Sequence, residues 1–189
     1  MTYPNWFDGQ IYNFDDNLKR FAGKPDLKFL QIGVFTGDAS AWLCENILTH
    51  PTSHLLDVDT WDGSKEPEHM SMDFNNVYVY YKKRMEPYDN VKSVRNNSNN
   101  FFRSYDGPMF DFIYIDGDHT SAQVEQDAYS AWKLLKHGGI MAFDDYLWGQ
   151  DLPSDATPKP AIDNFLRTHD GEYAQLVNSY QVWIQKNDN

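Results

Sequence analysis

The sequence predicts an α/β fold in which a mostly parallel sheet is finished by an antiparallel hairpin. Residues 112–115 are apolar at every position, as a strand covered on both faces requires. Apolar residues then recur at helical spacing over 124–135, and a second apolar run follows at 140–143. A strand, a helix and a strand in this order form a parallel pair with a right-handed crossover. Two closing runs around Asn178 and Ser179 predict the hairpin.

The crossover helix carries signals at both ends. Thr120, with Gln123 three residues later, has the form of a capping box, in which each side chain satisfies a backbone N–H of the first turn. Gly138 is placed to adopt the left-handed conformation that ends many helices. The helix is therefore expected between these two signals.

The remaining elements follow from apolar periodicity and turn residues. Asp38 can cap a helix whose apolar side is formed by Trp42, Leu43, Ile47 and Leu48. The other expected elements are strands at 29–33, 54–59 and 91–94, helices at 14–22, 74–85 and 161–167, and hairpin strands at 173–177 and 180–184.

The length of 189 residues fits one domain with a substantial core. We expect residues 1–25 to form an N-terminal cap segment laid against a single domain at 26–189. Within the cap, Trp6, Phe7 and Tyr12 are large and stand outside any periodic pattern, so they either pack on the surface or contact a substrate.

The composition limits the classes of partner. A net charge of -12 argues against a surface for nucleic acid or for an anionic membrane, which needs a basic footprint. A neutral or cationic small ligand suits this charge better. Cys44 is the only cysteine, which excludes an intramolecular disulfide and a cysteine-based zinc cluster, and its apolar neighbours predict a buried helix residue. The sequence shows no signal-peptide pattern and no apolar run of membrane-spanning length, so we expect a cytoplasmic protein.

Acidic residues gather where two neighbouring strands are expected to end. In a parallel sheet, ligands bind outside the carboxyl ends of the strands. One interpretation is that the acids there only solvate strand ends and cap helices. Five titratable groups at two adjacent strand ends favour a functional site instead: Asp116, Asp118, His119, Asp144 and Asp145.

A glycine turn follows the first strand. Gly33 and Gly37 are spaced G-x-x-x-G, which lets a ligand approach the backbone but differs from the G-x-G-x-x-G motif that holds a pyrophosphate. Some two dozen residues later, Asp59 ends the second strand and can accept hydrogen bonds from both hydroxyls of a ribose. Asp57 would take this role if the strand register slipped.

These residues resemble those of a known family, the class I S-adenosylmethionine-dependent methyltransferases. The similarity lies in the glycine turn at 31–37, Asp59, the Asp-Gly-Asp-His run within 115–119 and the Asp-Asp-Tyr run within 143–146. The nearest branch is that of the small O-methyltransferases related to macrocin-type and catechol or caffeoyl-CoA enzymes. The resemblance extends over about 29–184. It implies a Rossmann-like three-layer sandwich with a seven-stranded sheet, mostly parallel, whose last strand is inserted antiparallel.

The resemblance also implies where the cofactor S-adenosylmethionine would bind. The two glycines would line its methionine part, Asp59 would hold the ribose, and the residues after the third strand would lie near the adenine. The expected contacts are Gln31, Gly33, Phe35, Gly37, Asp59, Asn97, Ser98 and Asp116. Gln31 stands where the family usually has a glutamate, so a charge that faces the amino group of the cofactor is missing.

In the metal-dependent branch of this family, three acids after the fourth and fifth strands bind a divalent cation. Those positions are Asp116, Asp144 and Asp145 here. At about 5 Å and an effective dielectric of ~20, each pair of carboxylates repels by roughly 3 kcal/mol, so either one is protonated or a cation lies among them. Oxygen ligands without cysteine favour Mg²⁺, Ca²⁺ or Mn²⁺, and we expect Mg²⁺. His119 stands where catechol-type enzymes carry a lysine base, so His119 and Asp116 are the expected catalytic residues.

The leading hypothesis is therefore a methyltransferase that acts on a hydroxyl of a small molecule with help from a divalent metal. A catalytically silent relative that binds the cofactor or a partner protein is an alternative, kept open by Gln31. A nucleotide-dependent oxidoreductase is disfavoured by the glycine spacing and the closing hairpin. The acceptor pocket could be rimmed by Trp61, Tyr146 and Trp148, which could equally be packing residues. A homodimer is one arrangement that the resemblance allows.

Overall fold

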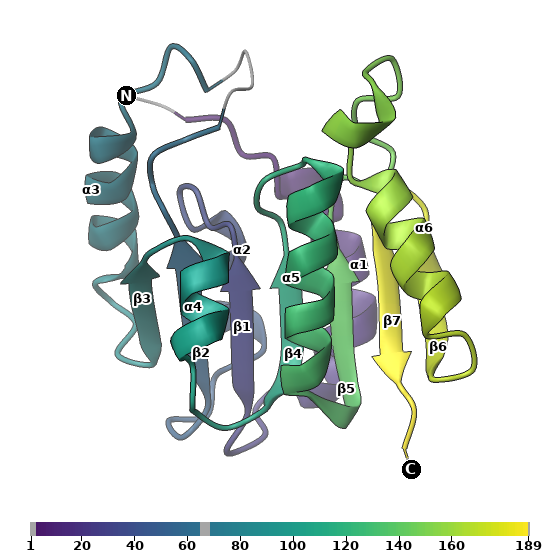
Figure 1. The fold of residues 1–189 in the computed structure, drawn as a ribbon. Helices are drawn as coiled ribbons and strands as arrows, with labels where there is room; N and C mark the ends of the chain where they lie inside the picture. Colours follow the sequence, from purple (N-terminus) through teal and green to yellow (C-terminus); the bar gives the residue numbers. More distant parts are fainter. Residues whose placement is uncertain (1–2, 65–68, 189) are drawn as a thin grey trace.

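The computed structural model describes residues 3–64 and 69–188, and its centre is one seven-stranded sheet (Figure 1). The strand order is β3-β2-β1-β4-β5-β7-β6. The first five strands are parallel, and β7 pairs antiparallel with both β5 and β6. The predicted fold class is thus confirmed. The strands are β1 (Lys28–Ile32), β2 (His54–Asp59), β3 (Val91–Arg95), β4 (Phe110–Ile115), β5 (Leu135–Phe143), β6 (Tyr173–Asn178) and β7 (Val182–Lys186).

Helices cover both faces of the sheet. On the face turned to the viewer in Figure 1 lie α4 (Ser98–Ser104), α5 (Ser121–Leu134) and α6 (Lys159–Thr168). The opposite side carries α1 (Ile11–Leu18), α2 (Asp38–Asn46) and α3 (Phe74–Met85). Short 3-10 helices at Asp8–Gln10, Lys19–Phe21 and Ser154–Ala156 complete the described elements. Within the described residues, no helix is long and apolar enough to cross a membrane.

The N-terminal segment is part of the core. Phe14 of α1 is fully buried, and its ring meets those of Phe112, Tyr114 and Trp183 edge-on, with centroids 4.8–5.9 Å apart. Aromatic rings in this arrangement stabilise a core beyond their buried area. Ahead of α1, the chain crosses above the carboxyl ends of the parallel strands (Figure 1). The N-terminal residues are therefore held over the edge of the sheet where ligands are expected.

Several local predictions were wrong. Asp38 does not cap α2, because Gly37 takes the N-cap position and Asp38 pairs with Arg84 at 2.6 Å. Gly138 does adopt a left-handed conformation, but the helix has already ended at Leu134, and the glycine lies in the irregular start of β5. The helix expected at 14–22 begins three residues earlier.

The predicted capping box of α5 is also absent. Thr120 occupies the N-cap position, yet its side chain makes no capping hydrogen bond. Gln123 instead directs its amide to Ser98, which opens α4, a helix that was not predicted from the polar run at 96–99. The two polar patterns thus combine into a contact between two helices rather than two separate caps.

Asp57 is a fully buried carboxyl in the middle of β2 and accepts a hydrogen bond from the hydroxyl of Tyr81 at 2.8 Å. Burial raises the pKa of Asp57 from 3.8 to about 7. The folded protein therefore keeps a proton that the unfolded chain releases near pH 4. Since the folded state binds more protons in this window, its stability falls as the pH rises from about 4 to 7.

Asp57→Asn is expected to reduce this pH dependence, because the amide cannot ionise. Between pH 5 and pH 8, the free energy of unfolding of the variant should fall by about 2–3 kcal/mol less than that of the wild type. Urea unfolding of both proteins at the two pH values measures this difference. An equal fall in both would show that the buried carboxyl does not carry the effect.

Candidate active site

A cavity of about 600 Å³ opens at the carboxyl ends of β1, β2, β4 and β5. Most of the residues expected at a functional site line it. Among the expected residues that do so are Gly33, Phe35, Asp59, Asn97, Ser98, Asp116, Asp118, His119, Asp144 and Asp145. The acids after β4 and those after β5 therefore face one common space.

The glycine turn brings the ends of β1 and β4 into direct contact. Gly33 has φ +80°, and a Cβ atom added to it would lie 1.8 Å from the backbone oxygen of Asp116. The backbone N–H of Asp116 also donates to the carbonyl of Ile32 at 2.8 Å. Only glycine allows this approach, which forms the floor of the cavity between the two strands.

Asp59 organises the turn around the cavity. Its two carboxylate oxygens accept from the backbone N–H groups of Val34 at 2.7 Å, Phe35 at 3.0 Å and Trp61 at 2.7 Å. The carboxylate thus fixes the glycine turn against the loop after β2. Since each carboxylate oxygen has more than one lone pair, Asp59 can still accept from a ligand hydroxyl.

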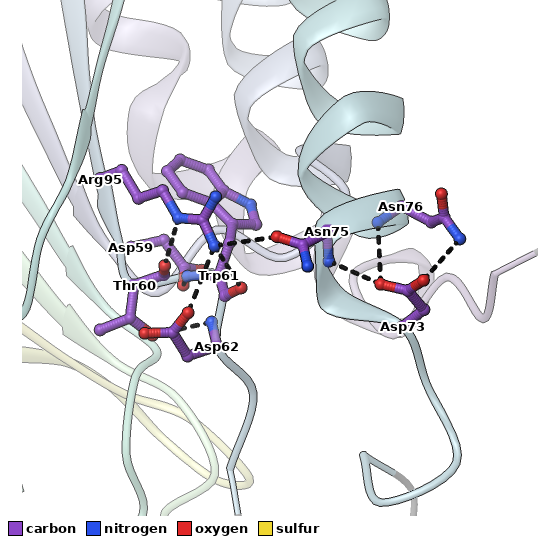
Figure 2. Close-up of polar contacts among 8 residues, drawn as sticks. All are labelled: Asp59, Thr60, Trp61, Asp62, Asp73, Asn75, Asn76 and Arg95. Carbon is purple, nitrogen blue, oxygen red and sulfur yellow. Dashed lines mark hydrogen bonds and ion pairs between the residues drawn. The ribbon is translucent and has the colours of Figure 1, made fainter.

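Arg95, at the end of β3, holds the loop that follows Asp59. Figure 2 shows its guanidinium donating to the backbone oxygens of Thr60 at 3.0 Å and Trp61 at 3.3 Å. The same group contacts the carboxylate of Asp62 at 3.2 Å and the side-chain oxygen of Asn75 at 3.4 Å, which links the loop to the start of α3. This wall of the cavity is therefore braced from outside.

Three side chains at the other end of the cavity are placed to share a cation. Asp116, His119 and Asp145 each offer one ligand atom, and these atoms all lie within 4.8 Å of one another. Nε2 of His119 lies 2.9 Å from Oδ2 of Asp145, and the hydroxyl of Tyr180 donates to the other oxygen of Asp145 at 2.8 Å. Asp145 has φ +57°, a left-handed conformation that turns its side chain toward this group.

Asp144 was expected as a metal ligand, but it is not a member of this group. One of its carboxylate oxygens accepts from the hydroxyl of Tyr114 and from the amide of Gln181 at 3.0 Å. The other accepts from the backbone N–H of Asp145 at 2.7 Å. Asp144 is thus placed to hold the turn that orients Asp145, and His119 takes the third place in the group.

Two carboxyls at this end, those of Asp116 and Asp144, have a raised pKa. Burial, together with Asp144 and Asp145, raises the pKa of Asp116 well above its usual value. Burial and the neighbouring Asp145 raise the pKa of Asp144 to about 6. A cation in their midst would oppose both effects, because it favours the ionised forms. Crowded acids of this kind are typical of functional sites.

Two expected cofactor contacts, Gln31 and Gly37, do not line the cavity. The amide of Gln31 is buried below the turn, where it donates to the carbonyl of Gly33 at 2.9 Å and accepts from Ser40 at 3.2 Å. Gly37 begins α2 and faces the ring of Tyr81. The structure gives both residues a supporting position, and their direct contact with a cofactor stays a prediction.

An aromatic wall closes one side of the cavity. The sequence analysis did not predict that its residues lie together. Phe35 stacks on Trp6 with ring centroids 4.7 Å apart and on His69 at 5.9 Å. Trp6 and His69 come from segments with no periodic pattern, so their meeting depends on tertiary structure. Phe7 is buried and also lines the cavity, whereas Tyr12 is largely exposed.

The three aromatic residues considered for an acceptor pocket separate in the structure. Trp148 lines the cavity, and its ring lies 4.7 Å from that of His119. Trp61 is 1% exposed and donates through its indole N–H to the carbonyl of Phe35, so it is a core residue. Tyr146 faces a separate hollow and bonds to Asp163.

Comparison with known proteins identifies the family to which the chain belongs. A family model described as a methyltransferase domain matches residues 30–146. A curated relative, the uncharacterized protein R132 of Acanthamoeba polyphaga mimivirus, is 24% identical over 161 residues, which are 80% of this chain and 64% of that protein. The chain thus spans less than two thirds of the length of that relative.

Solved structures share the fold at low identity. A putative rRNA-methylase from Clostridium thermocellum has a TM-score of 0.69 and 18% identity, over 100% of this chain and 99% of that one. The O-methyltransferase TomG from Streptomyces achromogenes, in complex with SAM, has a TM-score of 0.67 and 16% identity, over 98% of this chain and 82% of that one. The MycE methyltransferase of the mycinamycin pathway, in complex with Mg and SAH, has a TM-score of 0.64 and 17% identity, over 99% of this chain and 51% of that one.

The family model covers more than half of the chain, and the chain therefore belongs to the methyltransferase domain family. Its seven-stranded, mostly parallel sheet with the last strand inserted antiparallel is the one implied by the resemblance to class I S-adenosylmethionine-dependent methyltransferases, and the shared fold confirms it.

Proposed function

We propose that this protein is an S-adenosylmethionine-dependent methyltransferase that transfers a methyl group to a hydroxyl of a small molecule. The observation that carries the proposal is the single cavity that contains both the turn around Gly33 and Asp59 and the group of Asp116, His119 and Asp145. A sulfonium donor bound along the glycine turn would have its methyl group directed toward an acceptor at the acidic end.

In the reaction, the methyl carbon–sulfur bond breaks while a carbon–oxygen bond forms, and the hydroxyl proton leaves. The products are a methyl ether and S-adenosylhomocysteine. Holding the two reactants in line can supply roughly 7–11 kcal/mol of the barrier. While no cation is bound, His119 is the group proposed to receive the proton, since an imidazole titrates near neutrality and a positioned base adds about 10²–10⁴-fold. With a cation on its imidazole, the proton would leave to solvent from a hydroxyl whose pKa the ion lowers. Trp148 packs beside His119, with ring centroids 4.7 Å apart.

The residues at the acidic end fit a divalent cation. Asp116, His119 and Asp145 bring two carboxylates and one imidazole within range of a single ion. Carboxylates favour Mg²⁺ or Mn²⁺, and no cysteine ligand is available to favour zinc, because the one cysteine, Cys44, is buried elsewhere. When bound, such an ion would lower the pKa of the acceptor hydroxyl. The MycE structure contains Mg, which supports a cation site on this fold.

The acceptor is proposed to be a small molecule rather than RNA, although the structural relatives include a putative rRNA-methylase. The chain carries a net charge of -12, and six of the residues that line the cavity are aspartates: Asp59, Asp116, Asp118, Asp127, Asp144 and Asp145. A polyanion would be repelled by this surface, whereas the sulfonium and ammonium groups of the cofactor would be attracted.

Transfer of a labelled methyl group from S-adenosylmethionine tests the proposal. The purified protein is expected to label members of a panel of phenols, sugars and polyketides in the presence of Mg²⁺, and to leave a structured RNA unlabelled. Labelling of RNA alone would replace the small-molecule acceptor. Binding of S-adenosylhomocysteine without turnover across a broad panel would favour a catalytically silent binding protein.

A further inference from the structure

The tip of the closing hairpin contacts the turn that carries the two acids after β5. The hydroxyl of Tyr180 donates to Asp145 at 2.8 Å, and the side-chain amide of Gln181 donates to Asp144 at 3.0 Å. The backbone N–H of Tyr146 also donates to the carbonyl of Tyr180 at 2.9 Å. The antiparallel pairing of β7 with β5 brings the tip and this turn together. Two consecutive residues of the hairpin tip thus contact two consecutive acids.

Gln181 is fully buried, and its partners allow only one orientation of its amide. The indole N–H of Trp183, which can only donate, lies 2.8 Å from the side-chain oxygen of Gln181. The side-chain amide of Asn13, on α1, donates to the same oxygen at 2.9 Å. The oxygen of Gln181 is therefore fixed on this side, and its amide nitrogen must face Asp144.

Asp144 links Gln181 to the proposed cation ligand Asp145. One oxygen of Asp144 accepts from the amide of Gln181 and from the hydroxyl of Tyr114. The other oxygen accepts from the backbone N–H of Asp145 at 2.7 Å. Asp145 has φ +57°, and a residue with a side chain keeps such a conformation only where its surroundings hold it there. The result is that the carboxylate of Asp145 faces His119.

We propose that Gln181 is a positioning residue for the cation site, because it holds Asp145, through Asp144, in the conformation that faces the other two ligands. This inference rests on the proposed function. A buried amide is unfavourable unless its hydrogen bonds are made, so packing alone would be met by an apolar residue at this position. Groups that orient metal ligands from outside typically change the affinity for the metal about 10–100-fold when they are removed. Asn13 gives the N-terminal helix α1 a part in the same arrangement.

Calorimetric titration of Gln181→Met with Mg²⁺ and, separately, with S-adenosylhomocysteine tests this role. Methionine is similar in volume but cannot donate to Asp144, so the dissociation constant for Mg²⁺ should rise about 10–100-fold. The dissociation constant for S-adenosylhomocysteine should change by less than about twofold, because Asp59 holds the turn that would bind it at the ends of β1 and β2. Equal weakening of both ligands would give Gln181 a general structural role and overturn the inference.

Gln185→Met is the matched control, because Gln185 lies on the same strand and its amide donates to the carbonyl of Gly138 at 3.1 Å instead. This variant should bind Mg²⁺ as the wild type does, and urea unfolding shows whether each variant folds.

If Gln181→Met does not fold, Asn13→Ala removes one of the two donors that fix the amide and should weaken Mg²⁺ about 2–10-fold. A wild-type affinity for Mg²⁺ in the variant that folds overturns this inference alone. A wild type that binds S-adenosylhomocysteine but not Mg²⁺ overturns this inference and the cation site, and leaves methyl transfer in place. A wild type that binds neither overturns the proposed function as well.

Discussion

Gly33→Ala is expected to destabilise the protein by about 2–5 kcal/mol and to abolish cofactor binding. The left-handed conformation of Gly33 costs a residue with a side chain about 1–2 kcal/mol. The added Cβ would also meet the backbone oxygen of Asp116 at 1.8 Å, so β1 and β4 must separate, and overpacking typically costs about 1–3 kcal/mol. The separation would displace Asp116 from the floor of the cavity. Urea unfolding measures the first effect, and titration with S-adenosylhomocysteine measures the second.

Gly117→Ala provides the control in the same loop. A Cβ at Gly117 would have its nearest neighbour, a methyl group of Ile32, at 3.5 Å, an ordinary contact, and Gly117 has no left-handed conformation to preserve. This variant should unfold near the wild-type urea concentration. Equal stability of the Gly33 and Gly117 variants would contradict the close approach of the two strands.

Asp145→Asn is expected to abolish the heat of Mg²⁺ binding and to lower the rate of methyl transfer about 10²–10³-fold. The substitution removes one of the two carboxylates in the group with Asp116 and His119, and a cation that stabilises developing charge is worth several kcal/mol. Calorimetry with Mg²⁺ and the turnover of a labelled donor give the two readings.

Asp118→Asn is the matched control for this substitution. Asp118 lines the same cavity, but it is not a member of the proposed ligand group, and its side chain accepts from the backbone N–H of Thr120, which an asparagine can also do. This variant should bind Mg²⁺ as the wild type does. Equal heats in the wild type and in Asp145→Asn would end the proposal of a cation at this position.

The sequence was sufficient to predict that the acids of the candidate site lie together, because of one rule of parallel sheets. Asp116 and Asp145 end adjacent strands, and carboxyl ends of parallel strands meet at one edge. The apolar runs were long enough to define those strands. The sequence was not sufficient for the roles of neighbouring acids. Asp144 and Asp145 are identical and adjacent residues, so the sequence alone does not distinguish their roles. The turn after β5, in which Asp145 has a left-handed conformation, determines which of the two side chains faces His119.

Polar residues near helix starts were the main source of error. Thr120 and Gln123 match a capping box, but Gln123 has nearby partners on another helix, and these contacts replace the local one. The position of Asp127 in the cavity wall was not predicted, because an acid in an amphipathic helix is normally expected to be exposed. The aromatic wall around Phe35 was also not predictable, because Trp6 and His69 reach it from irregular segments.

The most direct test of the proposed cofactor site is calorimetric titration of the wild-type protein with S-adenosylhomocysteine. We expect saturable binding at one site per chain, lost in Gly33→Ala and retained in Gly117→Ala. Heats indistinguishable from dilution for the wild type would contradict the conclusion that the strand ends around Gly33 and Asp59 form a binding site for this cofactor.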